Sequence, residues 1–177
     1  IGAVTNVSCF GGANGSFTIN TSGGTPGYSY TLSPTNATSG FGTFTGLAAG
    51  SYTALVKDAA GCLTTVSVSI TQPSVLTLSL SSLPTSCNCS TNGTITAAGS
   101  GGTGPYQYNL NGGPFQSSGN FSGMGAGIYN ITLLDNNGCT LTQSVQVTQP
   151  APITLTLTSV NANCTAANGT ASVTTAG

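Results

Sequence analysis

An internal repeat of about 77 residues is the feature that most constrains how this chain folds. The run Asn14-Gly15-Ser16 returns as Asn92-Gly93-Thr94 and again as Asn168-Gly169-Thr170. A longer run, Gly23–Tyr30, returns as Gly101–Tyr108. Because self-similarity at a fixed period marks a tandem array, the sequence predicts two full repeats and part of a third.

Glutamine-proline pairs mark the expected ends of the copies. Gln72-Pro73 and Gln149-Pro150 each follow an apolar alternating segment, and proline lacks the backbone donor that a central strand needs. We therefore expect a first β-sandwich repeat over residues 1–73 and a second over residues 74–150. Residues 151–177 are expected to form a partial third repeat or a donor-strand segment.

Apolar and polar residues alternate within each full repeat, as at Phe17 and Ile19. A period of two is typical of strands with one buried face, and the sequence shows no helical period. Short strands separated by Gly-rich turns predict an all-β fold of tandem immunoglobulin-like β-sandwich domains. Tyr52 and Tyr129 each follow a glycine by two residues. They fit either the tyrosine corner of such sandwiches or ordinary core positions.

Charged side chains are almost absent from this sequence. There is one Lys or Arg, there are two acidic residues and no His, and charged residues are 2% of the chain, against about 25% in a typical domain. One cation cannot neutralise nucleic-acid phosphates or an anionic membrane surface, and no apolar run reaches the length of a membrane span. We therefore expect neither a nucleic-acid partner nor membrane insertion. A net charge near zero favours association between copies.

The residues that carry most enzyme chemistry are also missing. The two acids, Asp58 and Asp135, occupy equivalent positions in different repeats, so they do not form an acid/base pair. No base is present to activate a Ser or Cys nucleophile. We expect no catalytic residue and no cofactor. One carboxylate per Asp-x-x-Gly motif fits a hairpin turn better than calcium, and paired CxxC spacing for zinc is absent, so no metal site is expected.

The six cysteines show a regular placement. In each full repeat, one cysteine precedes the Asn-Gly pair and one follows the Asp-x-x-Gly motif, which predicts one bridge inside each repeat: Cys9–Cys62 and Cys87–Cys139. Closing a loop of about 53 residues contributes roughly 4 kcal/mol in the chain-entropy model. Disulfides also place the chain in an oxidising, extracytoplasmic compartment.

Two cysteines, Cys89 and Cys164, remain unassigned by this pattern. Cys164 belongs to the third copy. It pairs either with sequence that is not shown or, alternatively, with Cys89 or another chain.

Asn-x-Ser/Thr sequons are frequent on this uncharged chain. Glycans on Asn, Ser or Thr would keep such a surface soluble, so we treat glycosylation as a hypothesis. The candidate Asn sites are Asn6, Asn20, Asn36, Asn120 and Asn130.

The two ends of the sequence complement one another. The strand expected at Val75–Leu80 has no counterpart in the first copy, where Ile1 aligns with about Ser79, and Ile153–Leu157 repeats it. Either the chain is a fragment of a longer array, or separate subunits polymerise. In the second case Ile153, Leu155 and Leu157 fill the gap in the next subunit by donor-strand pairing.

Five segments together resemble a SprB-type repeat: Cys9–Ser16, Gly23–Tyr30, Gly46–Tyr52, Asp58–Cys62 and Gln72-Pro73. Such repeats occur in large surface adhesins and gliding-motility proteins of Bacteroidetes-type bacteria. The resemblance implies an extracellular, repetitive, immunoglobulin-like protein at the bacterial cell surface, exported through a type IX secretion route. It implies no catalytic residues.

We therefore expect a structural component of an extracellular filament or surface adhesin stalk, with disulfide-bonded repeats joined end to end. Its partners are then copies of itself or neighbouring repeats of the same chain. The alternative is a carbohydrate-binding adhesive module that recognises surface polysaccharide. Aromatic residues would stack on sugars in that case if they face outward, and otherwise they pack in the core: Tyr28, Tyr30, Tyr106 and Tyr108.

Overall fold

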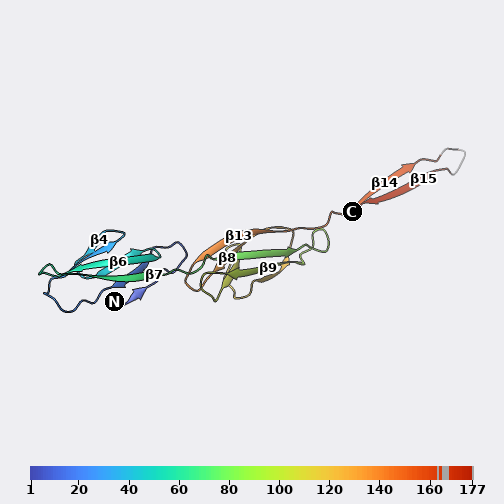
Figure 1. Cartoon of the computed structure of the whole chain (residues 1–177). Helices are drawn as coiled ribbons and strands as arrows, with labels where there is room; N and C mark the ends of the chain where they lie inside the picture. The colour runs from blue at the N-terminus through green and yellow to red at the C-terminus, as the bar shows by residue number, and fades with distance from the viewer. Residues whose placement is uncertain (163, 165–167, 177) are drawn as a thin grey trace. The chain divides into compact units, whose positions relative to one another are not determined.

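The fold is described from a computed structural model that places residues 1–162, 164 and 168–176. These residues form antiparallel strands, turns and loops without any helix, which confirms the all-β fold class (Figure 1). The strands are β1 (Val4–Thr5), β2 (Gly15–Thr18), β3 (Ser29–Ser33), β4 (Ala37–Ser39), β5 (Thr43–Leu47), β6 (Gly50–Lys57), β7 (Leu63–Ile70), β8 (Thr77–Leu83), β9 (Gly93–Ser100), β10 (Gln107–Leu110), β11 (Asn120–Met124), β12 (Gly127–Leu134), β13 (Thr140–Val147), β14 (Thr154–Val160) and β15 (Thr170–Ala176). The described part has no helix long and apolar enough to cross a membrane.

The first repeat folds as two antiparallel sheets over one core. One sheet has the order β1-β2-β5 and the other has the order β4-β3-β6-β7. Both sheets contribute to a single buried cluster, for example Phe17 and Phe44 from the first sheet and Leu32 and Ile70 from the second. Two sheets that share one core in this way form an immunoglobulin-like β-sandwich.

The predicted period of two explains how this core is filled. Along β6, Tyr52, Ala54 and Val56 are buried while their neighbours are exposed. Successive side chains of a strand point to opposite faces, so every second residue of β6 enters the core. The rings of Phe17 and Phe44 lie 5.3 Å apart, centroid to centroid.

The second repeat has two three-stranded sheets, with the orders β10-β12-β13 and β11-β9-β8. Their buried apolar residues again alternate along the strands, as predicted. These residues are Leu78, Ile95, Ala97, Tyr108, Ile131, Leu133 and Val147.

The glycine of each Asn-Gly pair is required by a close backbone approach. A Cβ on Gly15 would lie 2.8 Å from the Leu47 carbonyl oxygen, and one on Gly93 would lie 2.8 Å from the Met124 carbonyl oxygen. Both glycines are the first residues of strands, β2 and β9. The repeated Asn-Gly pair therefore marks the tight start of a strand and not a two-residue turn.

The tyrosine-corner interpretation is confirmed in both repeats. The hydroxyl of Tyr52 donates to the Ala48 carbonyl oxygen at 2.9 Å, and that of Tyr129 donates to the Gly125 carbonyl oxygen at 3.0 Å. Each bond ties the start of a strand to the loop before it, as in immunoglobulin-like sandwiches.

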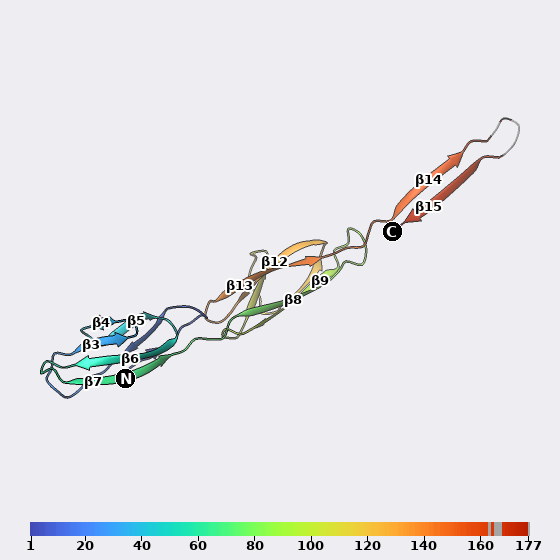
Figure 2. The same cartoon turned by 45° about the horizontal axis from the view of Figure 1, so that its top comes forward.

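The last strands form a hairpin of their own (Figure 2). β14 pairs with β15 along its whole length, from Thr154 opposite Ala176 to Val160 opposite Thr170. Every residue of the two strands is exposed.

The chain divides into two compact units that do not follow the repeat boundaries. The first unit comprises residues 1–78, 99–107 and 133–141, and the second comprises residues 79–98, 108–132 and 142–177. The repeat boundaries after residues 73 and 150 remain predictions from the sequence.

The core of the first repeat makes a stability prediction. Phe17 is 1% exposed, whereas Phe41 is 90% exposed. Phe17→Ala should lower the free energy of unfolding of this repeat by about 3–5 kcal/mol, because it leaves a cavity in a packed core. The matched control Phe41→Ala should change it by less than about 0.5 kcal/mol. Urea titration followed by tyrosine fluorescence measures both, and equal losses would contradict the assigned core.

Candidate functional site

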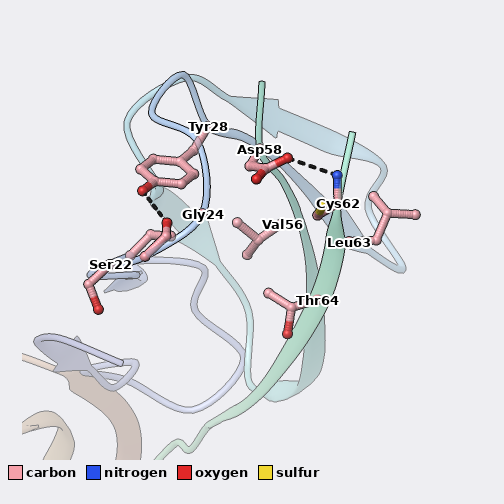
Figure 3. Close-up of a pocket in the computed structure, with 10 residues that line it drawn as sticks. Ser22, Gly24, Tyr28, Val56, Asp58, Cys62, Leu63 and Thr64 are labelled. Atoms are coloured by element: carbon pink, nitrogen blue, oxygen red, sulfur yellow. Dashed lines mark hydrogen bonds between the residues drawn. The ribbon is translucent and has the colours of Figure 1, made fainter. Parts of the chain in front are cut away.

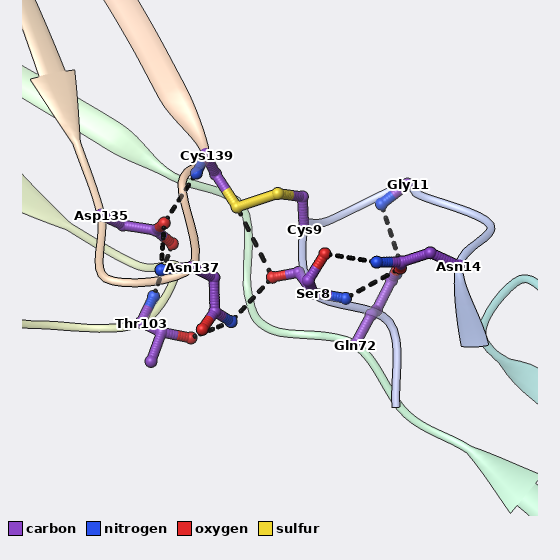
Figure 4. The surroundings of a disulfide bond; sticks show 9 residues. All are labelled: Ser8, Cys9, Gly11, Asn14, Gln72, Thr103, Asp135, Asn137 and Cys139. Atoms are coloured by element: carbon purple, nitrogen blue, oxygen red, sulfur yellow. Dashed lines mark hydrogen bonds between the residues drawn. A yellow bond between two sulfur atoms is a disulfide. The ribbon is translucent and has the colours of Figure 1, made fainter. Parts of the chain in front are cut away.

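A disulfide joins the two sequence repeats inside the first compact unit (Figure 4). Cys9, in the loop between β1 and β2, bonds to Cys139, in the turn between β12 and β13. Their Cα atoms lie 5.8 Å apart, and the two residues are separated by 130 positions in sequence. The bond therefore closes a long loop that contains most of both repeats.

This pairing corrects the bridges expected within each repeat. The pairs Cys9–Cys62 and Cys87–Cys139 are wrong in this structure, because Cys9 bonds to Cys139 and both Cys62 and Cys87 are exposed free thiols. Of the cysteines left unassigned by the sequence, Cys89 and Cys164 are also exposed and free.

The length of β7 explains why Cys9 and Cys62 do not meet. The Cys9 loop lies at the C-terminal end of β7, where Val7 N–H donates to the Thr71 carbonyl oxygen at 2.9 Å. Cys62 lies at the other end, directly before Leu63. Eight strand residues span about 25 Å, far beyond the roughly 7 Å between Cα atoms that a disulfide tolerates.

Side-chain amides hold the Cys9 loop in place. The Oδ1 atom of Asn14 accepts the Ser8 N–H at 3.0 Å, and its Nδ2 atom donates to Ser8 Oγ at 2.7 Å. Gly11 N–H donates to Gln72 Oε1 at 2.7 Å. The repeated Asn-Gly and Gln-Pro pairs thus support the cysteine loop, a role that their sequence positions alone did not reveal.

A buried carboxylate organises the turn that carries Cys139. Asp135 is 3% exposed. Its Oδ1 accepts the N–H groups of Asn137 and Cys139 at 2.9 Å and 2.8 Å, and its Oδ2 accepts the Thr103 N–H at 2.9 Å. Asp135 thus holds a hairpin turn, as predicted for the Asp-x-x-Gly motif.

The Asn137 side chain connects this turn to the Cys9 loop. Its Nδ2 donates to the Ser8 carbonyl oxygen at 2.9 Å and to Thr103 Oγ1 at 3.0 Å. The disulfide, this amide and the turn therefore form a clamp of Ser8, Cys9, Asn137 and Cys139, which we call the junction clamp.

The first repeat contains the same turn without a disulfide. Asp58 Oδ2 accepts the Thr25 N–H at 2.9 Å, and its Oδ1 accepts the Cys62 N–H at 2.8 Å. These hydrogen bonds, first from Thr25 and then from Cys62, lower the pKa of Asp58 below its ordinary value. The ionised carboxylate therefore supports the turn at neutral pH, and this support is lost as the pH falls through the lowered pKa.

A cavity of about 160 Å³ lies beside Cys62 (Figure 3). Tyr28 closes one side of it and donates its hydroxyl to the Gly23 carbonyl oxygen at 2.6 Å. The lining residues are Thr21, Ser22, Gly23, Gly24, Tyr28, Val56, Asp58, Cys62, Leu63 and Thr64.

The tyrosines considered for sugar stacking do not form an aromatic platform. Tyr30 and Tyr108 are core residues, 5% and 7% exposed. Tyr28 and Tyr106 are half-buried, and each hydroxyl bonds a nearby glycine carbonyl oxygen. Core packing therefore describes Tyr30 and Tyr108.

The remaining predicted residues lie on the surface. Ile153, Leu155 and Leu157 are 84%, 60% and 68% exposed. All of the candidate glycosylation sites are exposed: Asn6, Asn20, Asn36, Asn120 and Asn130. Glycosylation at these positions stays a prediction.

The fold places the chain in the class of tandem immunoglobulin-like β-sandwich proteins. Residues 1–37 and 80–115 match the family model described as the SprB repeat, which confirms the resemblance expected from the sequence over these two segments. Among solved structures, the chain is similar to the amphioxus IgVJ-C2 molecule, with 14% identity and a TM-score of 0.36, over 78% of this chain and 97% of that one. No curated protein matches the chain. The SprB repeat is a structural or adhesin type of family and not an enzymatic one.

The two aspartates allow a direct test of the disulfide. A protease that cleaves before Asp divides the chain into residues 1–57, 58–134 and 135–177. After alkylation of free thiols and unfolding without reductant, residues 1–57 and 135–177 should migrate together, with 58–134 released. Mass spectrometry identifies the fragments. If residues 1–57 instead remain joined to residues 58–134, Cys9 pairs with a cysteine of the middle fragment and the assignment is wrong.

Proposed function

We propose that this chain is a structural component of an extracellular filament or surface adhesin stalk, in which repeats are joined end to end. The observation that carries this proposal is the Cys9–Cys139 disulfide. It bonds the Cys9 loop of the first sequence repeat to the Asp135 turn of the second, so the array has a covalent link besides its backbone. Such a link suits a protein whose task is to hold a position under load.

The size of the closed loop supports a load-bearing role. Closing a loop of 130 residues contributes about 5 kcal/mol in the chain-entropy model. The same bond prevents the residues between Cys9 and Cys139 from being extended when force is applied to the two ends of the chain. The clamp hydrogen bonds from Asn137 to Ser8 and Thr103 add to this restraint.

The proposed location follows from the chemistry of the bond and from the family. Structural disulfides persist in oxidising compartments outside the cytoplasm. SprB repeats occur in surface-associated proteins of Bacteroidetes, and we extend to this chain the surface location, the type IX export route and the association with gliding motility. Immunogold electron microscopy of native cells with an antibody against the chain tests the location, and labelling confined to the cytoplasm would exclude it.

Single-molecule force spectroscopy tests the mechanical role. When the chain is pulled from its two ends without reductant, the residues between Cys9 and Cys139 should stay locked. Adding dithiothreitol should lengthen the fully extended chain by about 450 Å, because some 130 residues then become extensible at about 3.5 Å each. Cys89→Ser is the matched control and should show the same two lengths. An unchanged length after reduction would show that the disulfide carries no load.

A further inference from the structure

Two surfaces meet at the disulfide of the junction clamp. They line a common cavity of about 320 Å³. One surface, which we call the exit face, is formed by Cys9, Phe10, Ser74, Val75 and Leu76. The other, which we call the entry face, is formed by Gly102, Cys139, Thr140 and Leu141. All of these residues belong to the first compact unit.

The first repeat carries a second entry face, and none of the described residues forms an exit face against it. Gly24, Cys62, Leu63 and Thr64 are the repeat counterparts of the entry-face residues, and all four line the cavity beside Cys62. The turns match bond by bond. The Cys62 N–H donates to Asp58 Oδ1 at 2.8 Å, as the Cys139 N–H donates to Asp135 Oδ1 at 2.8 Å.

The second repeat carries a second exit face in the same way. A cavity of about 470 Å³ is lined by the repeat counterparts of all five exit-face residues: Cys87, Asn88, Ala151, Pro152 and Ile153. This second exit face lies in the other compact unit.

Hydrogen bonds show which cysteine of the Cys87-Asn88-Cys89 run corresponds to Cys9. The Ser86 N–H donates to Asn92 Oδ1 at 3.0 Å, as the Ser8 N–H donates to Asn14 Oδ1. The Cys89 N–H donates to Gln149 Oε1, as the Gly11 N–H donates to Gln72 Oε1. Cys89 and Gly11 both have positive φ angles, 59° and 75°. Cys87 is therefore the structural counterpart of Cys9, and Cys89 stands in the place of a glycine.

We propose that Cys62 and Cys87 are the two halves of a second disulfide, formed head to tail between copies of this chain. This inference rests on the proposed structural function and names its partner. The exit face of one copy would meet the entry face of the next copy as the two faces meet around Cys9–Cys139. Since the described part of each copy presents one unpaired face of each kind, the contact is heterologous and extends without closing.

The tail segment supplies the strand that this contact requires. In the second repeat, Gly102 N–H donates to the Ser74 carbonyl oxygen at 2.9 Å, and Leu78 is 7% exposed. Ala151 and Leu155 are the counterparts of Ser74 and Leu78. Ala151–Leu155 of one copy would then lie beside Gly24 of the next copy, and the side chains of Ile153 and Leu155 would become buried.

The bond forms by ordinary thiol–disulfide exchange. The Cys62 and Cys87 thiols lose two protons and two electrons in total, and a small disulfide or the disulfide of a thiol oxidoreductase accepts them and leaves as two thiols. Both thiols are exposed in this structure, so the oxidant reaches them before the copies join.

One residue makes the second junction weaker than the first. Ala60 occupies the position of Asn137. The hydrogen bond from the Asn137 side-chain amide to the Ser8 carbonyl oxygen therefore has no equivalent at Ser86. Ala60→Asn would restore that bond between copies and should speed cross-linking.

The test uses the whole chain with Cys89→Ser and Cys164→Ser as background. Incubation with oxidised glutathione should give a ladder of multimers on a non-reducing gel. Cys62→Ser alone and Cys87→Ser alone should each stay monomeric, and an equimolar mixture of the two should stop at a dimer. Cleavage before Asp should then give residues 58–134 joined to a second 58–134 fragment.

The strand is tested by a matched pair of substitutions. Leu155→Asp should slow cross-linking by about tenfold or more, because a charge would replace a buried leucine. Thr156→Asp, on the opposite face of the same strand, should leave the rate unchanged. A synthetic peptide of residues 151–157 should compete with cross-linking.

Three outcomes would overturn this inference. A ladder that persists in Cys62→Ser would show random oxidation, and equal rates for Leu155→Asp and Thr156→Asp would exclude the donated strand. Peptide binding without any cross-linking would show that the cavity takes a strand from another part of a longer chain. In each case, the dithiothreitol-dependent length of the single chain would be unaffected, so the proposed load-bearing function is tested separately.

Discussion

Hydrogen bonds from three backbone N–H groups to the Asp135 carboxylate fix the turn on which the disulfide depends. A hairpin turn with a cysteine at its end would otherwise move freely enough to present the sulfur in many directions. Asp135 holds the backbone on both sides of Cys139, and Asn137 then reaches the Ser8 carbonyl oxygen. The chain has two acidic residues, and both hold this position in their repeats. Carboxylates are therefore used where a neutral side chain would bind the N–H groups less strongly.

Uncharged groups provide most of the stabilising contacts in the rest of the fold. Each sandwich is held by an alternating apolar core and by tyrosines that tie strand starts to the preceding loops. Side-chain amides replace charged groups at the loops, with Asn14 and Gln72 supporting Cys9 in the first repeat. Asn92 and Gln149 make the corresponding bonds around Cys87 and Cys89. Because the two repeats share this hydrogen-bond pattern, their cysteines can be compared residue by residue.

Much of this fold could be predicted from the sequence, and the disulfide could not. The alternation at Phe17 and Ile19 predicted buried strand faces, because a period of two is visible without any knowledge of pairing. Cysteine positions within a repeat are different, because a disulfide depends on distance in space. Cys9 and Cys62 belong to the same repeat yet lie at opposite ends of β7. The sequence shows that Cys62 and Cys139 hold equivalent positions in their repeats. The disulfide partner of a cysteine could be assigned only from the pairing and register of the strands.

The direct contacts of the junction clamp are a covalent bond and hydrogen bonds from a neutral amide, and this affects how the clamp responds to salt concentration. Dissolved salt screens charges over about 10 Å at 0.1 M and over about 3 Å at 1 M. The contacts of Asn137 with Ser8 and Thr103 join uncharged groups, so an ionic atmosphere has little to screen. These direct contacts of the clamp should therefore change little between low and high salt concentration.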